Sequence, residues 1–142
     1  ALSQIGQSAD VIFAAAGATN NGVFDAVEEK QKLAIGVDSN QNWVKPGFIL
    51  TSMLKRVDLA VSNTIRAEKD GKFSTGVKYF GLEDKGVDYA LDEHNDKLIP
   101  QEMRISVENI RQEILSKKIK VPDYYITRKL CPKSPMNCEK AM

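Results

Sequence analysis

The stretch VIFAAAGATNNGVFDAVEEK, Val11 to Lys30, decides the fold class of this 142-residue chain. It opens with an apolar run at residues 11–16, which is typical of a strand buried on both faces of a parallel sheet. The first strand is therefore expected in the centre of the sheet. The turn GATNNG follows, and either Asn20 or Asn21 is placed to cap a helix.

In this helix, which we expect to end near Lys32, Val23, Phe24 and Val27 share one face. A second short apolar run, LAIGV at residues 33–37, comes next. Strand, turn, helix and strand within about thirty residues form a βαβ unit with a right-handed crossover. The sequence therefore predicts an α/β fold with a parallel sheet.

Further elements follow the same patterns. Residues 48–53 (FILTSM) predict a third strand, and apolar residues at helical spacing predict a helix over residues 54–70. A fourth strand is expected at residues 77–82, whereas residues 83–99 are rich in turn formers and carry no long element. A helix is expected to begin at Pro100, and the residues after Pro122 are expected to form an extended tail.

The composition excludes several classes of function. Twenty Lys and Arg against nineteen Asp and Glu leave a net charge of +1, and 42% of the residues are hydrophobic. Such a balance gives no overall field to attract nucleic acid or an anionic membrane. No apolar run is long enough to span a bilayer, and no signal peptide is recognisable. Because the chain also starts without Met, we expect a processed or truncated product.

The turn GATNNG lacks both common phosphate-binding motifs. A P-loop needs Lys and then Ser or Thr after its second glycine, but Val23 follows Gly22. A dinucleotide fingerprint needs a third glycine, which is missing. What remains is a turn with backbone amides and two carboxamides, suited to a neutral polar ligand. The alternative is a turn that serves packing only.

Ligands of open parallel sheets bind beyond the carboxyl ends of the strands, where Gly17, Asn21 and Asp38 are expected to face one crevice. The carboxylate of Asp38 is suited to accept hydrogen bonds from vicinal hydroxyls such as those of a ribose. Alternatively, it closes an Asx-turn with Asn40. Lys55 can reach the same crevice or lie solvated on the surface.

Other residues gave weaker signals. Trp43 is either an aromatic face for a ligand or a packing plug, and His94 is interpreted as a surface residue without a metal-binding partner. Catalytic motifs, metal-ligand spacings and cofactor fingerprints are lacking, so a binding module without catalytic residues or a cofactor is expected. Cys131 and Cys138 either form a small disulfide loop or remain thiols in the tail.

Several words of the sequence also resemble a known family, the basic membrane lipoproteins, or PnrA-like purine nucleoside-binding proteins of ABC transporters. These words occur in the order ADVIFAAAG, NGVFDAVEE, AIGVDSNQ, LTSMLKRVD, DGKF, YFGLEDKGV and IKVP. They cover residues 1 to about 122.

The resemblance implies the C-terminal portion of a type I periplasmic-binding-protein fold, with an incomplete three-layer αβα lobe. Residues 1–48 would form the second-lobe βαβ unit and residues 49–75 a hinge crossing with a first-lobe helix. Residues 76–122 would form the return crossing and a terminal helix, followed by an extended tail at 123–142.

The resemblance also implies a function, because Asp38 and Lys55 match positions that hold the ribose of a nucleoside, and Gly17 lines the pocket. It implies an extracytoplasmic protein that delivers a purine nucleoside to an ABC permease and is held at the cell membrane by a lipid anchor on the intact precursor. The alternative is a cytoplasmic ligand-sensing regulator or interaction module of the same fold. A small nucleotide-dependent enzyme is a third hypothesis, which the absent phosphate motif disfavours.

Overall fold

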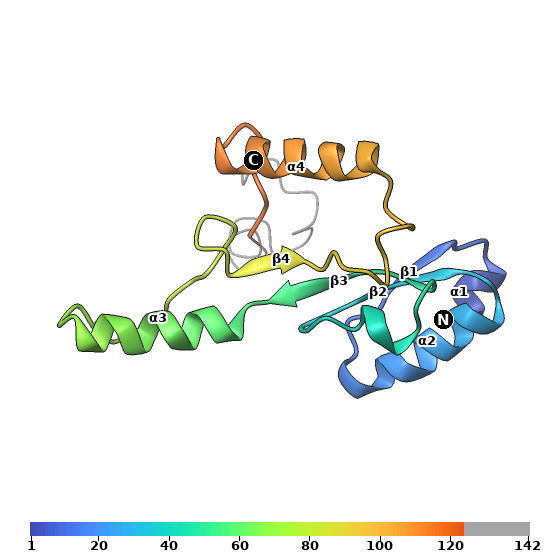
Figure 1. Ribbon diagram of the computed structural model, residues 1–142, viewed down its shortest axis with the longest axis horizontal. Helices are drawn as coiled ribbons and strands as arrows, with labels where there is room; N and C mark the ends of the chain where they lie inside the picture. The colour runs from blue at the N-terminus through green and yellow to red at the C-terminus, as the bar shows by residue number, and fades with distance from the viewer. Residues whose placement is uncertain (124–142) are drawn as a thin grey trace, which may run out of the picture. The chain divides into compact units, whose positions relative to one another are not determined.

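The computed structural model describes residues 1–123 and divides into two compact units, of which the first is Ala1–Gln101 and the second begins at Glu102. The first unit contains one open sheet in the order β1-β2-β3-β4 (Figure 1). Its strands are β1 (Val11–Phe13), β2 (Leu33–Gly36), β3 (Ile49–Lys55) and β4 (Val87–Tyr89). The first three are parallel and β4 is antiparallel to β3. The predicted α/β class and the predicted βαβ unit are confirmed.

Helices and 3-10 turns connect these strands. The short helix α1 (Leu2–Gly6) precedes β1, and the 3-10 turn η1 (Gly17–Thr19) leads into α2 (Asn20–Glu29). A second 3-10 turn, η2 (Asn42–Val44), lies between β2 and β3. The core is formed where α2 packs on the sheet, by the buried residues Ile12, Phe24, Val27, Ala34 and Ile49.

The prediction of a central first strand is wrong, because β1 is an edge strand of the described sheet. Its pairing with β2 covers one side, and only the middle residue, Ile12, is buried. Val11 and Phe13 are 41% and 59% exposed. The apolar run thus correctly predicted a strand, but the side chains on one of its faces lack a covering layer within the described residues.

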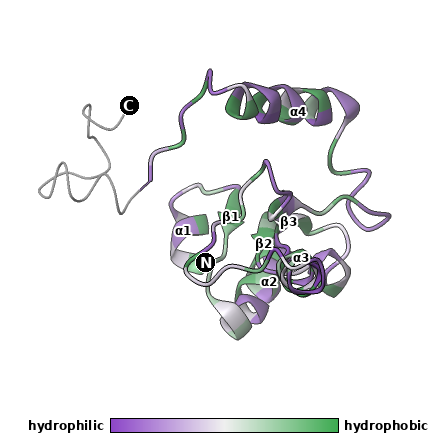
Figure 2. Cartoon of the chain, turned by 90° about the vertical axis from the view of Figure 1, so that its left-hand side faces the viewer, coloured by the Kyte–Doolittle hydropathy of each residue, from purple (hydrophilic) through white to green (hydrophobic). Residues whose placement is uncertain are grey.

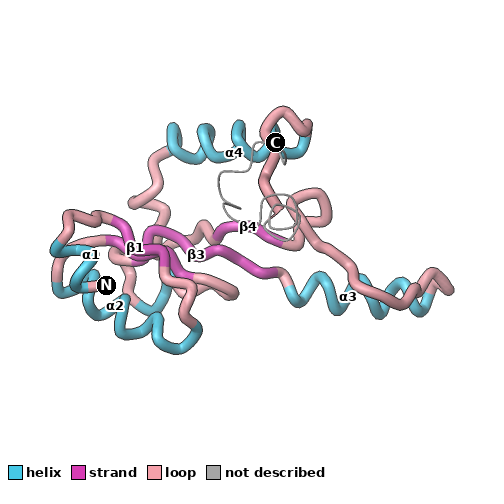
Figure 3. The backbone as a smooth tube through the Cα atoms, turned by 180° about the vertical axis from the view of Figure 1, so that it is seen from behind, coloured by secondary structure: helices cyan, strands magenta, loops and turns pink. Residues whose placement is uncertain are grey.

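Strand β3 is longer than predicted, and it pairs in parallel with β2 and in antiparallel with β4. Its first half pairs with β2, and its second half, from Met53 to Lys55, pairs with β4. Because the strand continues to Lys55, helix α3 (Val57–Lys69) begins three residues later than the predicted helix. Figure 3 shows β3 leading almost directly into α3.

The fourth strand was predicted in the wrong place. Residues 77–82 lie in irregular structure, with Val77 and Tyr79 82% and 85% exposed, while β4 forms at 87–89. Strand formation depends on a neighbouring strand as well as on side-chain propensity, and among the described residues no strand pairs with residues 77–82. Instead, the chain turns back on itself here, with the N–H of Gly86 donating to the carbonyl of Gly81 at 2.8 Å.

Helix α4 (Gln101–Leu115) confirms the helix predicted after Pro100. Apolar and polar residues alternate along it (Figure 2), and Met103 and Ile110 are 44% and 50% exposed. Within residues 1–123 no helix combines the length and apolar character needed to cross a membrane. The predicted tail and both cysteines lie outside the described residues, apart from Asp123.

Candidate functional site

The turn after β1 is built around Gly17. This residue has a φ of +57°, which L side chains rarely adopt, and opens the 3-10 turn that leads into α2. A Cβ placed on it would meet no atom within 4 Å. Glycine is therefore required here by backbone conformation and not by crowding, and the space in front of the turn is open.

Asp38 lies in an uncommon backbone conformation directly beyond β2. Its φ is +70°, and the N–H of Ser39 donates to the carbonyl of Val37 at 2.9 Å, closing a three-residue turn around Asp38. A positive φ at the centre of such a turn is rare and strained. Strain of this kind clusters at functional sites, which favours Asp38 as a site residue.

Lys55, the last residue of β3, lies beside Asp38. Its N–H donates to the Asp38 carbonyl at 2.9 Å, so the two residues are neighbours at the end of the parallel sheet. Both are exposed. Among the described residues, neither the carboxylate nor the ammonium group makes a hydrogen bond or an ion pair. The site therefore presents one acceptor group and one donor group whose charges are not used by the fold.

A cavity of about 380 Å³ adjoins Lys55. It lies where β3, β4 and the start of α3 meet, and its lining is mainly apolar. Pockets of this size with few polar groups are typical of small-molecule sites. The lining residues are Met53, Lys55, Arg56, Val57, Ala60, Phe80, Gly86 and Val87.

The two asparagines of the turn have different places. Asn21 is exposed in the first turn of α2, whereas Asn20 is 1% exposed. Neither caps the helix, because the cap position is Thr19 and no side chain there makes a cap hydrogen bond. The side chain of Asn20 instead accepts a hydrogen bond from the N–H of Ala16 at 3.1 Å. The capping prediction is therefore wrong.

A buried polar network joins the loops at this end of the sheet. The side-chain oxygen of Gln41 accepts from the N–H of Val37 at 3.0 Å, and the backbone N–H of Gln41 donates to Ser52 Oγ at 3.0 Å. Ser52 in turn donates to Asn42 at 2.8 Å, and both residues are fully buried. Beyond the apolar core, the loop after β2 is thus joined to β3 by hydrogen bonds between polar residues.

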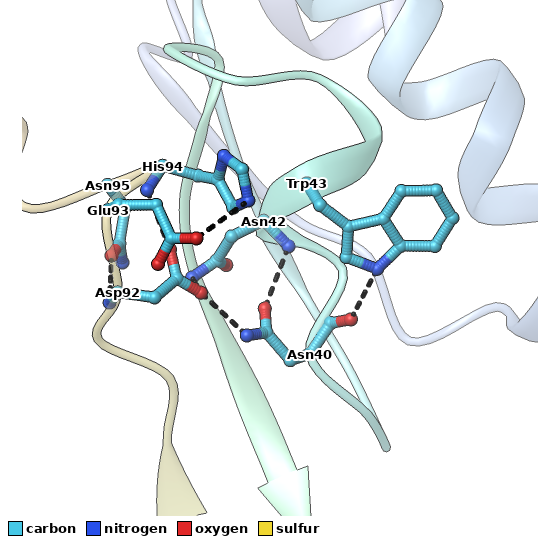
Figure 4. Close-up of polar contacts among 7 residues, drawn as sticks. All are labelled: Asn40, Asn42, Trp43, Asp92, Glu93, His94 and Asn95. Atoms are coloured by element: carbon cyan, nitrogen blue, oxygen red, sulfur yellow. Dashed lines mark hydrogen bonds and ion pairs between the residues drawn. The ribbon is translucent and has the colours of Figure 1, made fainter.

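The network ends at Asp92, in the loop after β4 (Figure 4). Its carboxylate accepts hydrogen bonds from Asn40 at 2.6 Å, from Asn42 at 3.1 Å and from the backbone N–H of His94 at 2.8 Å. Burial raises the pKa of Asp92, but these hydrogen bonds, led by that from Asn40, outweigh it and leave the pKa lowered. The carboxylate is therefore held in its charged form.

Asp92, Glu93 and His94 bring three possible metal-ligand atoms within 4.8 Å of one another. His94 therefore has neighbours that the sequence prediction did not foresee. Since the Asp92 carboxylate is already occupied by three donors, the fold itself accounts for this cluster.

The structure excludes one of the two alternatives for Trp43 and one of the two for Asp38. Trp43 is 64% exposed and its indole N–H donates to the Asn40 carbonyl at 3.0 Å, so it is not a packing plug. The side chain of Asn40 accepts from the N–H of Asn42 at 3.0 Å, forming its own Asx-turn (Figure 4). The alternative in which Asp38 closes such a turn with Asn40 is not found.

The structure thus brings Asp38 and Lys55 together directly. Gly17 is connected to them through Asn20 and Gln41, whereas no contact of the Asn21 side chain links it to this group. Sequence reasoning missed Gln41, Asn42, Ser52 and Asp92, and it considered Asn20 only as a helix cap. Two signals were available in the sequence: Gly36 inside a buried strand and Ser52 inside an apolar strand. Such residues indicate that another group approaches the strand closely.

Comparisons with known proteins identify a family model and several relatives that match this chain. The model of the family described as PnrA-like ABC transporter substrate-binding proteins (Bmp) matches residues 1–124. An uncharacterised lipoprotein of Pyrococcus abyssi is 38% identical over 95 residues, which cover 63% of this chain and 24% of that protein. Basic membrane protein D of Borreliella burgdorferi is 36% identical over 117 residues, which cover 80% of this chain and 34% of that protein.

Two solved structures share the fold. A solute-binding protein of an ABC transporter system from Aeropyrum pernix superposes with a TM-score of 0.73 at 26% identity, covering 98% of this chain and 48% of that one. A transcriptional activator of the comK gene from Bacillus halodurans gives a TM-score of 0.71 at 22% identity, covering 78% and 38%, and shows the fold alone. In each comparison the chain spans less than half of the other protein's length.

Proposed function

The chain belongs to the family of PnrA-like substrate-binding proteins of ABC transporters, and from this premise we propose that its protein binds a purine nucleoside or a similar ribosylated ligand for uptake. The ligand is bound and released without a chemical reaction. The observation that carries this proposal is the hydrogen bond of 2.9 Å between Lys55 N–H and the Asp38 carbonyl. It supports the proposal because it makes neighbours, at the end of the sheet, of the two residues that carry, within the described part of the chain, a free carboxylate and a free ammonium group.

This pair is suited to recognise a ribose. A carboxylate accepts hydrogen bonds from two vicinal hydroxyls, and an ammonium group donates to hydroxyl or ring oxygens. The positive φ of Asp38 supports the proposal, because backbone strain is retained where a side chain must be presented in one direction. Gly17 and Asn21 are proposed to line the crevice beside the pair.

The base of the nucleoside is proposed to be held by the remainder of the protein, which closes over this half of the site. In this proposal residues 1–48 belong to the second lobe and residues 49–75 form a crossing and a helix of the first lobe. Residues 76–122 then form the return crossing and a terminal helix. Antiparallel pairing of β3 with β4 supports the assignment, since one strand leaves the lobe and the other returns.

We further propose that the protein acts outside the cytoplasm and delivers its ligand to an ABC permease. A lipid anchor on the intact precursor would hold it at the cell membrane. The names of the relatives support this proposal, because they describe a lipoprotein and a basic membrane protein.

Substitution of Asp38 tests the proposal. In the protein expressed from its complete coding sequence, Asp38→Ala is expected to weaken the binding of inosine, guanosine or adenosine at least tenfold, equivalent to about 1.4 kcal/mol, as measured by calorimetry. The matched control is Asp70→Ala, an exposed aspartate at the end of α3. Equal affinity of the Asp38 variant and the unsubstituted protein would remove Asp38 from the site, and a protein that binds none of the three nucleosides would contradict the proposed ligand class.

A cytoplasmic ligand-sensing regulator of the same fold is the second candidate function. The likeness to a transcriptional activator favours it only at the level of the fold. The two functions are distinguished by the coding sequence upstream of Ala1. A signal peptide and a lipidation motif there would exclude the cytoplasmic regulator, and their absence from the complete gene would exclude the lipoprotein.

A further inference from the structure

Gln41 lies where the turn after β1 meets the turn after β2. Its side-chain oxygen accepts the N–H of Val37, the residue before Asp38, at 3.0 Å. The same oxygen accepts from the Asn20 side chain at 3.4 Å, and Asn20 accepts the N–H of Ala16, the residue before Gly17, at 3.1 Å. Two carboxamides in series, those of Gln41 and Asn20, thus connect the backbone positions that precede two candidate binding residues.

The position of Gln41 is fixed from two further sides. Its backbone N–H donates to the fully buried Ser52 hydroxyl of β3 at 3.0 Å. Beneath it lies Gly36, where a Cβ would come within 2.7 Å of the Gln41 side-chain oxygen and 2.9 Å of Ser52 Oγ. Gly36 has no positive φ, so the reason for a glycine inside this strand is the space that the Gln41 side chain occupies.

We propose that Gln41 is a positioning residue of the binding site, which holds the turns carrying Gly17 and Asp38 in one arrangement before the ligand arrives. The proposal rests on the proposed function, because it assigns both turns to one ligand. Its physical basis is that the N–H of the buried residue Val37 must keep an acceptor, which confines the turn carrying Asp38. The turn carrying Gly17 is held through the buried side chain of Asn20. A ligand that meets ordered turns does not have to order them, and its affinity is higher for that reason.

The test compares Gln41→Leu, which removes the acceptor at similar size, with Gln41→Glu, which keeps an oxygen there. In the protein expressed from its complete coding sequence, Gln41→Leu is expected to weaken nucleoside binding about tenfold, with a less favourable entropy of binding in calorimetry. Gln41→Glu is expected to restore most of the affinity. The matched control, Gln4→Leu, changes an exposed glutamine of α1 and is expected to bind as the unsubstituted protein does.

A second measurement needs no ligand. In hydrogen exchange of the unliganded protein, Gln41→Leu is expected to speed exchange of the Ala16 and Val37 amides together, while amides of the buried part of α2 keep their rates. Gly36→Ala is expected to do the same, because it displaces the Gln41 side chain without removing it. If Gln41→Leu fails to fold, Gly36→Ala still tests whether Gln41 connects the two turns.

The outcomes separate the two proposals. Undiminished nucleoside binding by Gln41→Leu, or equal losses with Leu and Glu, would overturn the positioning role while leaving the proposed function intact. If the unsubstituted protein binds no nucleoside, the proposed function fails, and hydrogen exchange then decides on Gln41. Exchange at Ala16 and Val37 that changes independently, or not at all, would overturn the connection between the turns.

Discussion

Helices α2 and α3 each follow a strand of the same sheet, and each carries apolar residues at helical spacing. In α2, Phe24 and Val27 are fully buried against the sheet, whereas in α3 Val61 and Ile65 are 53% and 65% exposed. Figure 1 shows α2 alongside the strands and α3 continuing beyond the end of β3. An apolar stripe therefore predicts that a helix needs a partner surface, but does not predict that the partner lies within the same stretch of chain.

The two regions also differ in how they are stabilised. The sheet with α2 and its connecting loops, here called the sheet region, combines a buried core with the polar network around Gln41. Helix α3 relies on local contacts, such as the bidentate pair between Arg56 and Asp58 and the bond from Thr64 Oγ1 to the Ala60 carbonyl. A 13-residue helix is only marginally stable by such contacts alone, so we expect α3 to depend on a covering surface.

The largest expected effect comes from the core of the sheet region. Phe24→Ala is expected to lower the free energy of unfolding by about 3 to 5 kcal/mol, because it leaves a cavity under α2. The matched control is Phe73→Ala, which changes a 47% exposed phenylalanine beyond α3 whose ring faces Lys78 at 5.3 Å. Its expected cost is below about 1 kcal/mol. Urea unfolding of the protein expressed from its complete coding sequence measures both.

If Phe24→Ala and Phe73→Ala lowered the free energy of unfolding by similar amounts, the proposed difference in packing between the two regions would be wrong. Such similar losses would mean that Phe73 is as thoroughly packed in the complete protein as Phe24 is in the core.

The fold of the sheet region could be predicted from its sequence because the signals there are local. The strand at residues 33–37, the face formed by Phe24 and Val27, and the parallel crossover all follow from short-range periodicity. The position of β4 could not be predicted, because it depends on the edge that β3 offers after it passes β2. The edge position of β1 likewise depends on neighbours that are distant in the sequence or outside it.

The candidate site could be predicted in part for the same reason. Gly17 and Asp38 directly follow the two apolar runs that predicted strands, and the carboxyl ends of parallel strands meet at one edge. Their positions were therefore informative. The strained φ of Asp38 could not be predicted, because it is set by the three-residue turn. The sequence also could not predict that Asn20 and not Asn21 makes the buried contact. Both asparagines occur in the same turn, and the backbone conformation of that turn decides which of them points inward.

An intermediate effect is expected on α3 and tests whether its apolar face is covered in the complete protein. Because we propose that α3 belongs to the first lobe, whose remaining part would cover this face, Ile65→Ala is expected to lower the free energy of unfolding by about 2 kcal/mol. The control on the opposite side of the helix, the exposed Asn63 in the variant Asn63→Ala, is expected not to lower it. An Ile65 variant as stable as the Asn63 variant would show that the apolar face of α3 remains exposed, which would break the assignment of α3 to the first lobe.

The smallest expected effect concerns two aspartates, one in each region, whose pKa values are both lowered. A hydrogen bond from Arg56 is the main cause for Asp58, while for Asp92 burial raises the pKa and the hydrogen bonds led by Asn40 outweigh it. Each carboxylate therefore contributes stability above the ordinary aspartate pKa of about 3.9, and this contribution is lost as the pH falls through the lowered value. At about 1 M salt the Debye length shrinks to about 3 Å, which weakens ion pairs at the surface.

Carboxyl titrations by NMR at low and high salt are expected to separate these causes. The pKa of Asp58 should rise toward its ordinary value in high salt, whereas that of Asp92 should change less, because its main donors are neutral amides and His94 contributes least. Arg56→Gln serves as the control, since it should raise the pKa of Asp58 at low salt and leave Asp92 unchanged. An equal rise of the two pKa values in high salt would mean that the charge of His94, and not the amide network, lowers the pKa of Asp92. The sheet region and α3 would then not differ in how they stabilise a carboxylate.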